Sequence, residues 1–202
     1  MKHKIIFASS NSGKINELQT LLDEFNYEII PQNNLGIHDA EETGLTFVEN
    51  ALLKARNACL QSGKPAIADD SGLVVAALDG APGIYSARYA GKHSNAHANT
   101  EKLLKDLQDV PDENRHAHFH CTLVYLEHAE DPAPLICEGI WHGIILHSPA
   151  GTNGFGYDPV FYDADEKSSA AELSQTRKNQ ISHRGQALRS LIEKLKYART
   201  YC

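Results

Sequence analysis

The spacing of apolar residues predicts alternating strands and helices in the first part of the chain. A β-branched and aromatic run at residues 4–8 ends in turn-forming residues, which predicts a strand followed by a loop. After Lys14, apolar side chains recur at Ile15, Leu18 and Leu22, the spacing of an amphipathic helix. Residues 27–31 form a second β-rich run. The chain therefore opens with a strand, a loop, a helix and a second strand.

A second helix is predicted from residue 47 to Gly63. Thr46 and Glu49 have the spacing of a capping box, in which each residue satisfies a backbone or side-chain group of the other. Apolar residues then follow at helical period, and Gly63 supplies a C-terminal stop. The polar segment before this helix, residues 32–44, is expected to be an acidic loop.

Two adjacent carboxylates, Asp69 and Asp70, follow a short apolar run at residues 66–68 and lead into a predicted turn at Ser71 and Gly72. Side chains in a strand alternate between faces, so only one of the two carboxylates can serve a given site. That one is a candidate for binding a metal ion or water. A surface turn, in which Asp and Ser bond nearby backbone groups, explains the pair equally well.

The second part of the chain predicts a helix, a hairpin and a closing helix. Leu103 and Leu107 belong to the first of these helices, and a second strand after the Asp pair is expected at residues 73–78. Two long β-rich runs at 119–126 and 135–146 predict an antiparallel hairpin. Apolar residues from Ile181 to Leu195 predict the last helix. The fold class is therefore α/β, a mixed β-sheet flanked by helices, with the late hairpin forming part of a second lobe.

Composition limits the possible functions. At 202 residues we expect a single domain over residues 1–202. A net charge of -7 argues against general binding to nucleic acid, which needs clustered positive charge to neutralise phosphates. Because apolar runs fall short of the roughly 20 residues that span a bilayer, we expect no membrane association and a cytoplasmic protein. The cysteines lack a C-x-x-C spacing and are interpreted as free thiols: Cys59, Cys121, Cys137 and Cys202.

A tract with three histidines, His116, His118 and His120, places imidazoles at strand spacing on one face. This pattern superficially suggests a transition-metal site. A carboxylate or thiolate partner at ligand spacing is missing nearby, so the tract is interpreted as a solvated strand face.

The loop between the first strand and the first helix has the ingredients of a phosphate cradle. Backbone N–H groups at a helix N-terminus attract anions, hydroxyl groups add donors, and a lysine adds charge. The loop residues are Ser9, Ser10, Asn11, Ser12, Gly13 and Lys14. The first glycine of a Walker A loop is absent, and Ile15 replaces its hydroxyl residue. A helix cap without a ligand is the alternative.

Three carboxylates supply the hard oxygen ligands that Mg²⁺ accepts: Glu41, Glu42 and Asp70. A metal ion beside a phosphate loop would make a triphosphate site. Further positive charge for phosphates is available from Lys54, Lys178 and Arg184, although each alone is most simply a surface cation.

Six motifs in order along nearly the whole chain resemble the inosine triphosphate pyrophosphatase family. They are SSNSGK at 9–14, ETGLTF at 42–47 with NA at 50–51, ADDSGL at 68–73, GAPGIYSAR at 80–88, GFGYDP at 154–159 and SHRG at 182–185. The resemblance implies a nucleotide cleft between lobes and Mg²⁺-dependent hydrolysis of deaminated purine nucleoside triphosphates. The products would be the monophosphate and pyrophosphate, and the substrates would include ITP, dITP, XTP and dXTP. It also implies a homodimer.

Carried over motif by motif, the resemblance implies a role for each matching residue. The loop from Ser9 to Lys14 would hold the triphosphate, and Asp70 would be the catalytic carboxylate that binds Mg²⁺ or orients the attacking water. The first-loop acid maps to Glu41, with the neighbouring Glu42 as the alternative. Ser71 would follow Asp70 into the site. Ser10 departs from the glycine that the family often has before Asn11, which changes only the local backbone freedom.

The resemblance also assigns base recognition. The residues that would close over the base are Phe155, Gly156, Tyr157 and Asp158, with Phe155 available for stacking. Lys178, His183 and Arg184 would reach phosphate or the purine carbonyl edge. Donors aimed at a 6-oxo group are left unpaired when a 6-amino group arrives, and such donors would reject ATP.

Two other functions compete with this interpretation. One is a pyrophosphatase for modified pyrimidine or ordinary nucleotides, acting from a related pocket. The other is a nucleotide-binding sensor without hydrolysis, which the retained carboxylates Glu41, Glu42 and Asp70 count against. A phosphatase with an aspartate nucleophile is disfavoured because its D-x-D-x-[TV] pattern is absent.

Overall fold

A computed structural model describes residues 3–23, 27–91 and 95–200 of the chain. The strands are β1 (His3–Phe7), β2 (Tyr27–Pro31), β3 (Ala66–Val75), β4 (His116–Leu126), β5 (Leu135–Ile145), β6 (Phe161–Asp163) and β7 (Ser168–Ser169). The helices are α1 (Ser12–Asp23), α2 (Phe47–Ser62), α3 (Ala96–Asp106), α4 (Gln175–Ile181) and α5 (His183–Thr200). Short 3₁₀ segments lie at Gln32–Leu35, Ala76–Leu78, Gly83–Arg88, Asp112–Asn114 and Asp158–Val160.

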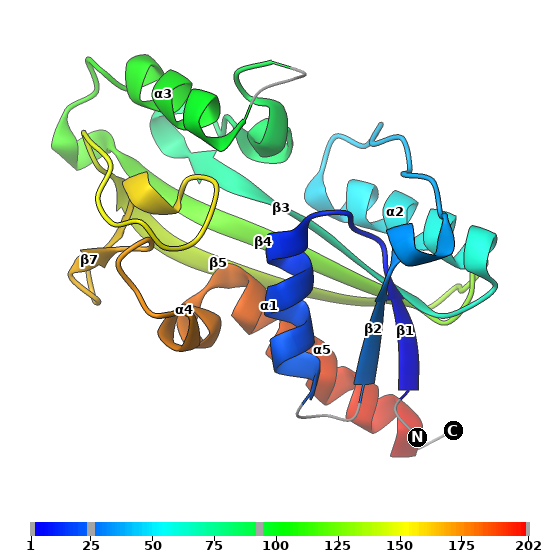
Figure 1. The fold of residues 1–202 in the computed structure, drawn as a ribbon. Helices are drawn as coiled ribbons and strands as arrows, with labels where there is room; N and C mark the ends of the chain where they lie inside the picture. Colours follow the sequence, from blue (N-terminus) through cyan, green and yellow to red (C-terminus); the bar gives the residue numbers. More distant parts are fainter. Residues whose placement is uncertain (1–2, 24–26, 92–94, 201–202) are drawn as a thin grey trace. The chain divides into compact units, whose positions relative to one another are not determined.

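The strands form one mixed sheet in the order β2-β1-β3-β4-β5-β6-β7. Figure 1 shows the strands and helices along the chain. β1 pairs in parallel with β2 and with β3, whereas β6 pairs antiparallel with β5 and β7. The Ile145 N–H donates to the Arg115 carbonyl, and Thr122 bonds Glu138, so β4 and β5 run in opposite directions. The predicted α/β class, with a mixed sheet and a late antiparallel hairpin, is confirmed.

The chain divides into two compact units, each built from several segments. Unit 1 comprises residues 1–70, 121–139 and 184–202, and unit 2 comprises residues 71–120 and 140–183. The long strands β3, β4 and β5 contribute residues to both units. None of the helices in the described ranges combines the length and the apolar character that a membrane crossing requires.

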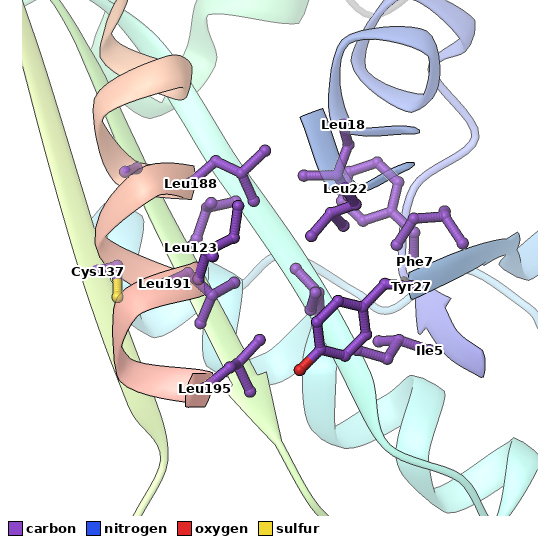
Figure 2. Packing of buried hydrophobic residues seen from close by; sticks show 14 of the residues in the cluster. Ile5, Phe7, Leu18, Leu22, Tyr27, Leu123, Cys137, Leu188, Leu191 and Leu195 are labelled. Atoms are coloured by element: carbon purple, nitrogen blue, oxygen red, sulfur yellow. The ribbon is translucent and has the colours of Figure 1, made fainter. Parts of the chain in front are cut away.

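Strand alternation builds two hydrophobic clusters in unit 1. Ile5, Phe7 and Ile67 point to one face, where α1 and α5 cover them, as Figure 2 shows for Leu18, Leu22, Leu188 and Leu191. The intervening residues, such as Ile6 and Ala68, point to the other face and pack under α2. Small residues of α2 make this contact close: Ala51, Ala55 and Ala58. Unit 1 is therefore a three-layer arrangement with a helix layer on each face.

Unit 2 has its own hydrophobic cluster. Leu103 and Leu107 from the region of α3 pack with Leu73 of β3, Phe119 of β4 and Trp141 of β5. The fully buried guanidinium of Arg115 donates to the carbonyl oxygens of Leu107, Ile145 and Leu146. These bonds add donors to backbone acceptors near the ends of α3 and β5, where helix and strand carbonyls often lack partners within their own element.

Two boundaries differ from the sequence predictions. The turn predicted at Ser71 and Gly72 is wrong: both residues lie inside the continuous strand β3, because the extended backbone there belongs to the sheet. The prediction of a single closing helix that begins at Ile181 is also wrong. Ser182 has an extended backbone that ends α4 and separates Ile181 from α5. Cys59, Cys121 and Cys137 are buried free thiols as predicted, and Cys202 lies outside the described residues.

Candidate active site

The α2 helix has the termini that its sequence predicts. The Thr46 hydroxyl oxygen accepts from the Glu49 N–H, and Glu49 accepts from the Thr46 hydroxyl and the Leu45 N–H. Gly63 ends the helix in the left-handed region with φ 64. Lys54 lies on the third turn of α2. Because the capping box sets where the helix begins, it also sets where Lys54 lies along the helix.

Lys54 joins two of the carboxylates singled out from the sequence. Its ammonium lies 2.6 Å from Asp70 Oδ1 and 3.0 Å from Glu42 Oε1, all within unit 1. Burial opposes charge on Lys54, but Asp70 and Glu42 outweigh that effect and raise its pKa. Lys54 is thus a charged clamp that holds Asp70 and Glu42 near each other.

Asp70 has one oriented oxygen and one unpartnered oxygen. Lys54 binds Oδ1, whereas the buried Oδ2 has no hydrogen-bond partner within the described part of the chain. Burial raises the pKa of Asp70, and the positive charge of Lys54 offsets part of that rise. A buried carboxylate oxygen without a donor is costly for the fold alone, and it is available to a metal ion or to water.

The loop that carries Glu42 is held against the start of α2. The Gly44 N–H donates to Asn50 Oδ1 at 2.9 Å. A Cβ atom on Gly44 would lie 2.5 Å from Glu49 Cβ, so only glycine permits this approach. The two neighbouring acids lie in different environments: Glu42 meets Lys54, whereas Glu41 is exposed and makes no side-chain hydrogen bond or ion pair with the described residues.

Asp69 points into a different environment from Asp70, as strand alternation predicts. It is fully buried and accepts from the Lys14 ammonium, from Arg184 Nε at 2.9 Å and from the Cys121 thiol at 3.3 Å. Burial would raise its pKa, but Lys14 and Arg184 outweigh burial and hold it well below the usual value. Asp69 is therefore the central acceptor of a buried ion network.

Glu17 completes that network, and the sequence reading missed it. Its carboxylate pairs with Arg184 Nη1, while Asp69 holds Arg184 Nε. Burial opposes charge on Arg184, but Asp69 and Glu17 raise its pKa. Glu17 follows Lys14 by three residues and so lies on the same face of α1, a spacing that places it near the site but does not predict its pairing with Arg184.

The predicted phosphate loop lies at the N-terminus of α1 and is largely exposed. The Asn11 side chain accepts from the Lys14 N–H at 3.1 Å, and Ser9 Oγ accepts from the Asn11 N–H at 3.2 Å. Ser12, Gly13 and Lys14 already belong to the helix rather than to the loop. The helix cap exists, and Lys14 joins the loop to Asp69.

In unit 2, Asp158 organises two other predicted site residues. Its Oδ2 accepts from the Lys178 ammonium at 2.6 Å and from the Phe155 N–H at 2.7 Å. The Lys178 ammonium is buried and lies 4.9 Å from the centroid of the Phe155 ring, which is 37% exposed. A Cβ atom on Gly154, which has φ +75, would lie 2.1 Å from Asp158 Oδ2. This assembly offers an open aromatic face beside a fixed cation.

Several other residues predicted for the site are packed against the rest of the protein. His183 is buried and stacked on Phe119, with 4.8 Å between ring centroids. Tyr157 is buried in the unit 2 cluster, and its hydroxyl donates to the Ser86 carbonyl at 2.9 Å. Ser71 is half-buried within β3, and Gly156 has φ +65 in the loop after Phe155. Tyr157 thus attaches the loop to the unit 2 cluster, and its ring is not exposed to solvent.

No group of three or more His, Cys, Asp or Glu side chains in the described part of the chain is arranged to hold a metal ion. The oxygen donors that fit a cation are two carboxylates, Asp70 and Glu42. Mg²⁺ is commonly bound by one or two carboxylates together with substrate phosphates and water. The pair fits that mode, and the unpartnered Asp70 Oδ2 is the donor that the fold leaves available.

Comparisons with known proteins identify the relatives of this chain. The sequence profile described as the Ham1 family matches residues 5–194. A dITP/XTP pyrophosphatase of Shigella flexneri is 58% identical over 96% of this chain and 98% of its own length. The dITP/XTP pyrophosphatase of Escherichia coli strain K12 is 56% identical over the same shares. A solved HAM1 protein from Coxiella burnetii has a TM-score of 0.90 at 50% identity, covering 96% of this chain and 99% of that one.

Proposed function

Because this chain belongs to the Ham1 family, we propose that it hydrolyses deaminated purine nucleoside triphosphates to the nucleoside monophosphate and pyrophosphate. The resemblance drawn from the six motifs is confirmed, and the chain is a nucleoside triphosphate pyrophosphatase. The names of its relatives support dITP and XTP as substrates. We propose ITP and dXTP in addition, because they carry the same 6-oxo purine edge.

The observation that carries the proposal is the state of Asp70. Lys54 fixes one carboxylate oxygen, and the other is buried without a partner among the described residues. A side chain held in this way can accept a proton from water or bind a cation without first breaking a bond. Positioning of this kind accounts for much of the rate enhancement in phosphoryl and nucleotidyl transfer.

We propose Mg²⁺ as the metal ion, held by Asp70 and Glu42. When bound, it would neutralise charge on the phosphates and on the departing pyrophosphate. Lys54 lies against both carboxylates and keeps them oriented, since its raised pKa leaves it charged at neutral pH. Asp70 would hold the attacking water toward the α-phosphorus and accept its proton.

The start of α1 supports triphosphate binding. Its first N–H groups, the exposed hydroxyl groups of Ser10 and Ser12 and the half-buried hydroxyl of Ser9 are donors for phosphate oxygens. Asp69 holds the Lys14 ammonium from one side, so the charge is fixed in place before any nucleotide binds. A preorganised cation loses less side-chain entropy on binding than a mobile one does.

In unit 2, the open ring of Phe155 supports a role in stacking on a base. Asp158 and Lys178 fix the loop that carries this ring. For rejection of ATP we propose the donors that the resemblance assigns, His183 and Arg184. A site that donates to a 6-oxo group leaves its donors unpaired against a 6-amino group, which costs binding free energy in the transition state.

We further propose that the protein is a homodimer, which light scattering of the purified chain would test.

A substrate panel tests the proposed function. The protein with Mg²⁺ would receive inosine, xanthosine, adenosine, guanosine or thymidine triphosphate, and pyrophosphate and orthophosphate would be measured separately. We expect pyrophosphate from the inosine and xanthosine substrates and little from ATP. Equal rates on ATP and ITP would refute the specificity. Tight binding without turnover would indicate a sensor instead.

Two variants test the residue assignment. Glu42→Gln should lose more activity than Glu41→Gln, because only Glu42 reaches Lys54 in the described structure. The two residues are neighbours of the same chemistry, so each variant is the matched control for the other. A larger loss in Glu41→Gln would move the metal-side acid back to the first residue of the doublet.

A further inference from the structure

Two histidines from neighbouring strands of unit 2 lie side by side. The ring centroids of His118 on β4 and His142 on β5 are 5.7 Å apart with an interplanar angle of 49°. Phe119 and Trp141 are buried in the unit 2 cluster, so strand alternation places His118 and His142 on the opposite face of the sheet. The sequence interpretation found no partner for the histidine tract because the partner comes from the next strand, more than 20 residues away.

The separation of the two rings matches that of two imidazoles bound to one metal ion. A zinc–nitrogen bond is about 2.0–2.1 Å long, so two rings on one ion have centroids about 5–6 Å apart. The observed 5.7 Å lies in this range. His120 is also near, 6.5 Å from His118 by ring centroids, at the outer limit for sharing an ion. Cross-strand neighbours have Cβ atoms close enough for chelation without moving the backbone.

We propose that His118 and His142 form a binding site for a divalent transition-metal ion of the Ni²⁺, Cu²⁺ or Zn²⁺ class. Water would complete the coordination, since the described residues contain no group of three metal-ligating side chains. Imidazole nitrogen suits these ions, whereas the carboxylates of Asp70 and Glu42 suit Mg²⁺. The site is therefore chemically distinct from the one that the proposed hydrolysis uses.

The pair can be reached from outside the protein. His142 is exposed, so an ion from solvent can reach the pair directly.

Calorimetric titration of the full chain with NiCl₂ tests the proposal. An excess of Mg²⁺ in the cell occupies the carboxylates, which leaves the imidazoles as the preferred ligands for Ni²⁺. We expect one ion per chain. His142→Gln should weaken binding by about tenfold or more, because a single imidazole lacks its chelating partner. His128→Gln is the matched control: it removes an exposed histidine from the β4–β5 connection and should leave binding unchanged.

Spectroscopy separates the pair from weaker binding elsewhere. The electron paramagnetic resonance spectrum of the Cu²⁺ complex should show couplings to two imidazole nitrogens, reduced to one in His142→Gln and in His118→Gln. His142 is exposed, so its variant is expected to fold normally, and circular dichroism checks the half-buried His118→Gln. Unchanged Ni²⁺ affinity in His142→Gln would overturn the proposal. So would a stoichiometry of one ion per two chains, which would indicate bridging between molecules.

Discussion

Exchanging Asp69 and Asp70 one at a time for Asn separates a structural carboxylate from a functional one at adjacent positions. Asp69 accepts from Lys14, Arg184 and Cys121 inside the protein. Two of these are charged hydrogen bonds worth about 1.5–3 kcal/mol each. Removing one partner of a buried ion network costs about 3–5 kcal/mol, because the remaining charges are left uncompensated. Asp69→Asn should therefore lose a large share of the folding free energy, which is about 5–15 kcal/mol for a typical domain.

Asp70→Asn should behave in the opposite way. Asp70 is buried, its pKa is raised, and one oxygen lacks a partner in the described structure. Because burial outweighs its ion pair with Lys54, ionised Asp70 adds little net stability, and the free energy of unfolding should change by no more than about 1 kcal/mol. Turnover of ITP should nevertheless fall by a factor of about 100 or more, as expected for loss of a positioned proton acceptor.

Urea denaturation without Mg²⁺, at several pH values, measures both effects. The folded pKa of Asp69 is lowered, so its stabilisation is present above the unfolded pKa of about 3.9 and is lost only as pH falls through the lower folded value. The deficit of Asp69→Asn should thus persist from neutral pH down to about pH 4 and shrink below it. A destabilised Asp70→Asn with a normal Asp69→Asn would refute the assignment of roles.

Three further predictions follow from individual contacts. Lys54→Met removes the cation beside Asp70, so the pKa of that buried carboxyl should rise and the acidic limb of the kcat/KM profile should move to higher pH; Lys54→Arg, which keeps the charge, should shift it less. Asp158→Asn frees Lys178 and should raise KM by about 10- to 150-fold, as expected for a charged hydrogen bond of about 1.5–3 kcal/mol, and an unchanged KM would contradict this role. Burial and Asp69 raise the pKa of Cys121, so iodoacetamide at pH 8 should label it only after denaturation, as peptide mass spectrometry would show.

Local signals in the sequence predicted the elements that depend on local interactions. The capping box at Thr46 and Glu49 and the glycine at 63 bound α2 as expected, because these groups bond within one helical turn. The second strand occupies residues 27–31 as its β-branched residues predict. The opposed environments of Asp69 and Asp70 followed from the two-residue period of a strand, which holds wherever the strand is.

The errors arise where the rest of the fold overrides local preference. Ser71 and Gly72 form turns in isolation, yet sheet pairing keeps them extended within β3. Ile181 fits the apolar period of the last helix, but Ser182 interrupts the backbone between α4 and α5. Turn propensity contributes only a small free energy, which a row of inter-strand hydrogen bonds exceeds.

The candidate site was predicted as a set of residues but not as a set of contacts. The sequence singled out Lys14 and Asp70 by their motifs and Lys54 by its charge, whereas the pairing of Lys14 with Asp69 depends on residues far apart in the chain. Glu41 and Glu42 cannot be told apart by composition. The close approach at Gly44 fixes which of them reaches Lys54.

Isotope labelling of the products tests the central claim most directly. Hydrolysis of ITP in water enriched in ¹⁸O would be followed by mass spectrometry of inosine monophosphate and pyrophosphate. Attack of water on the α-phosphorus predicts one ¹⁸O atom in the monophosphate and none in the pyrophosphate. Label in the pyrophosphate, or release of labelled orthophosphate, would place the attack at another phosphorus and contradict the account.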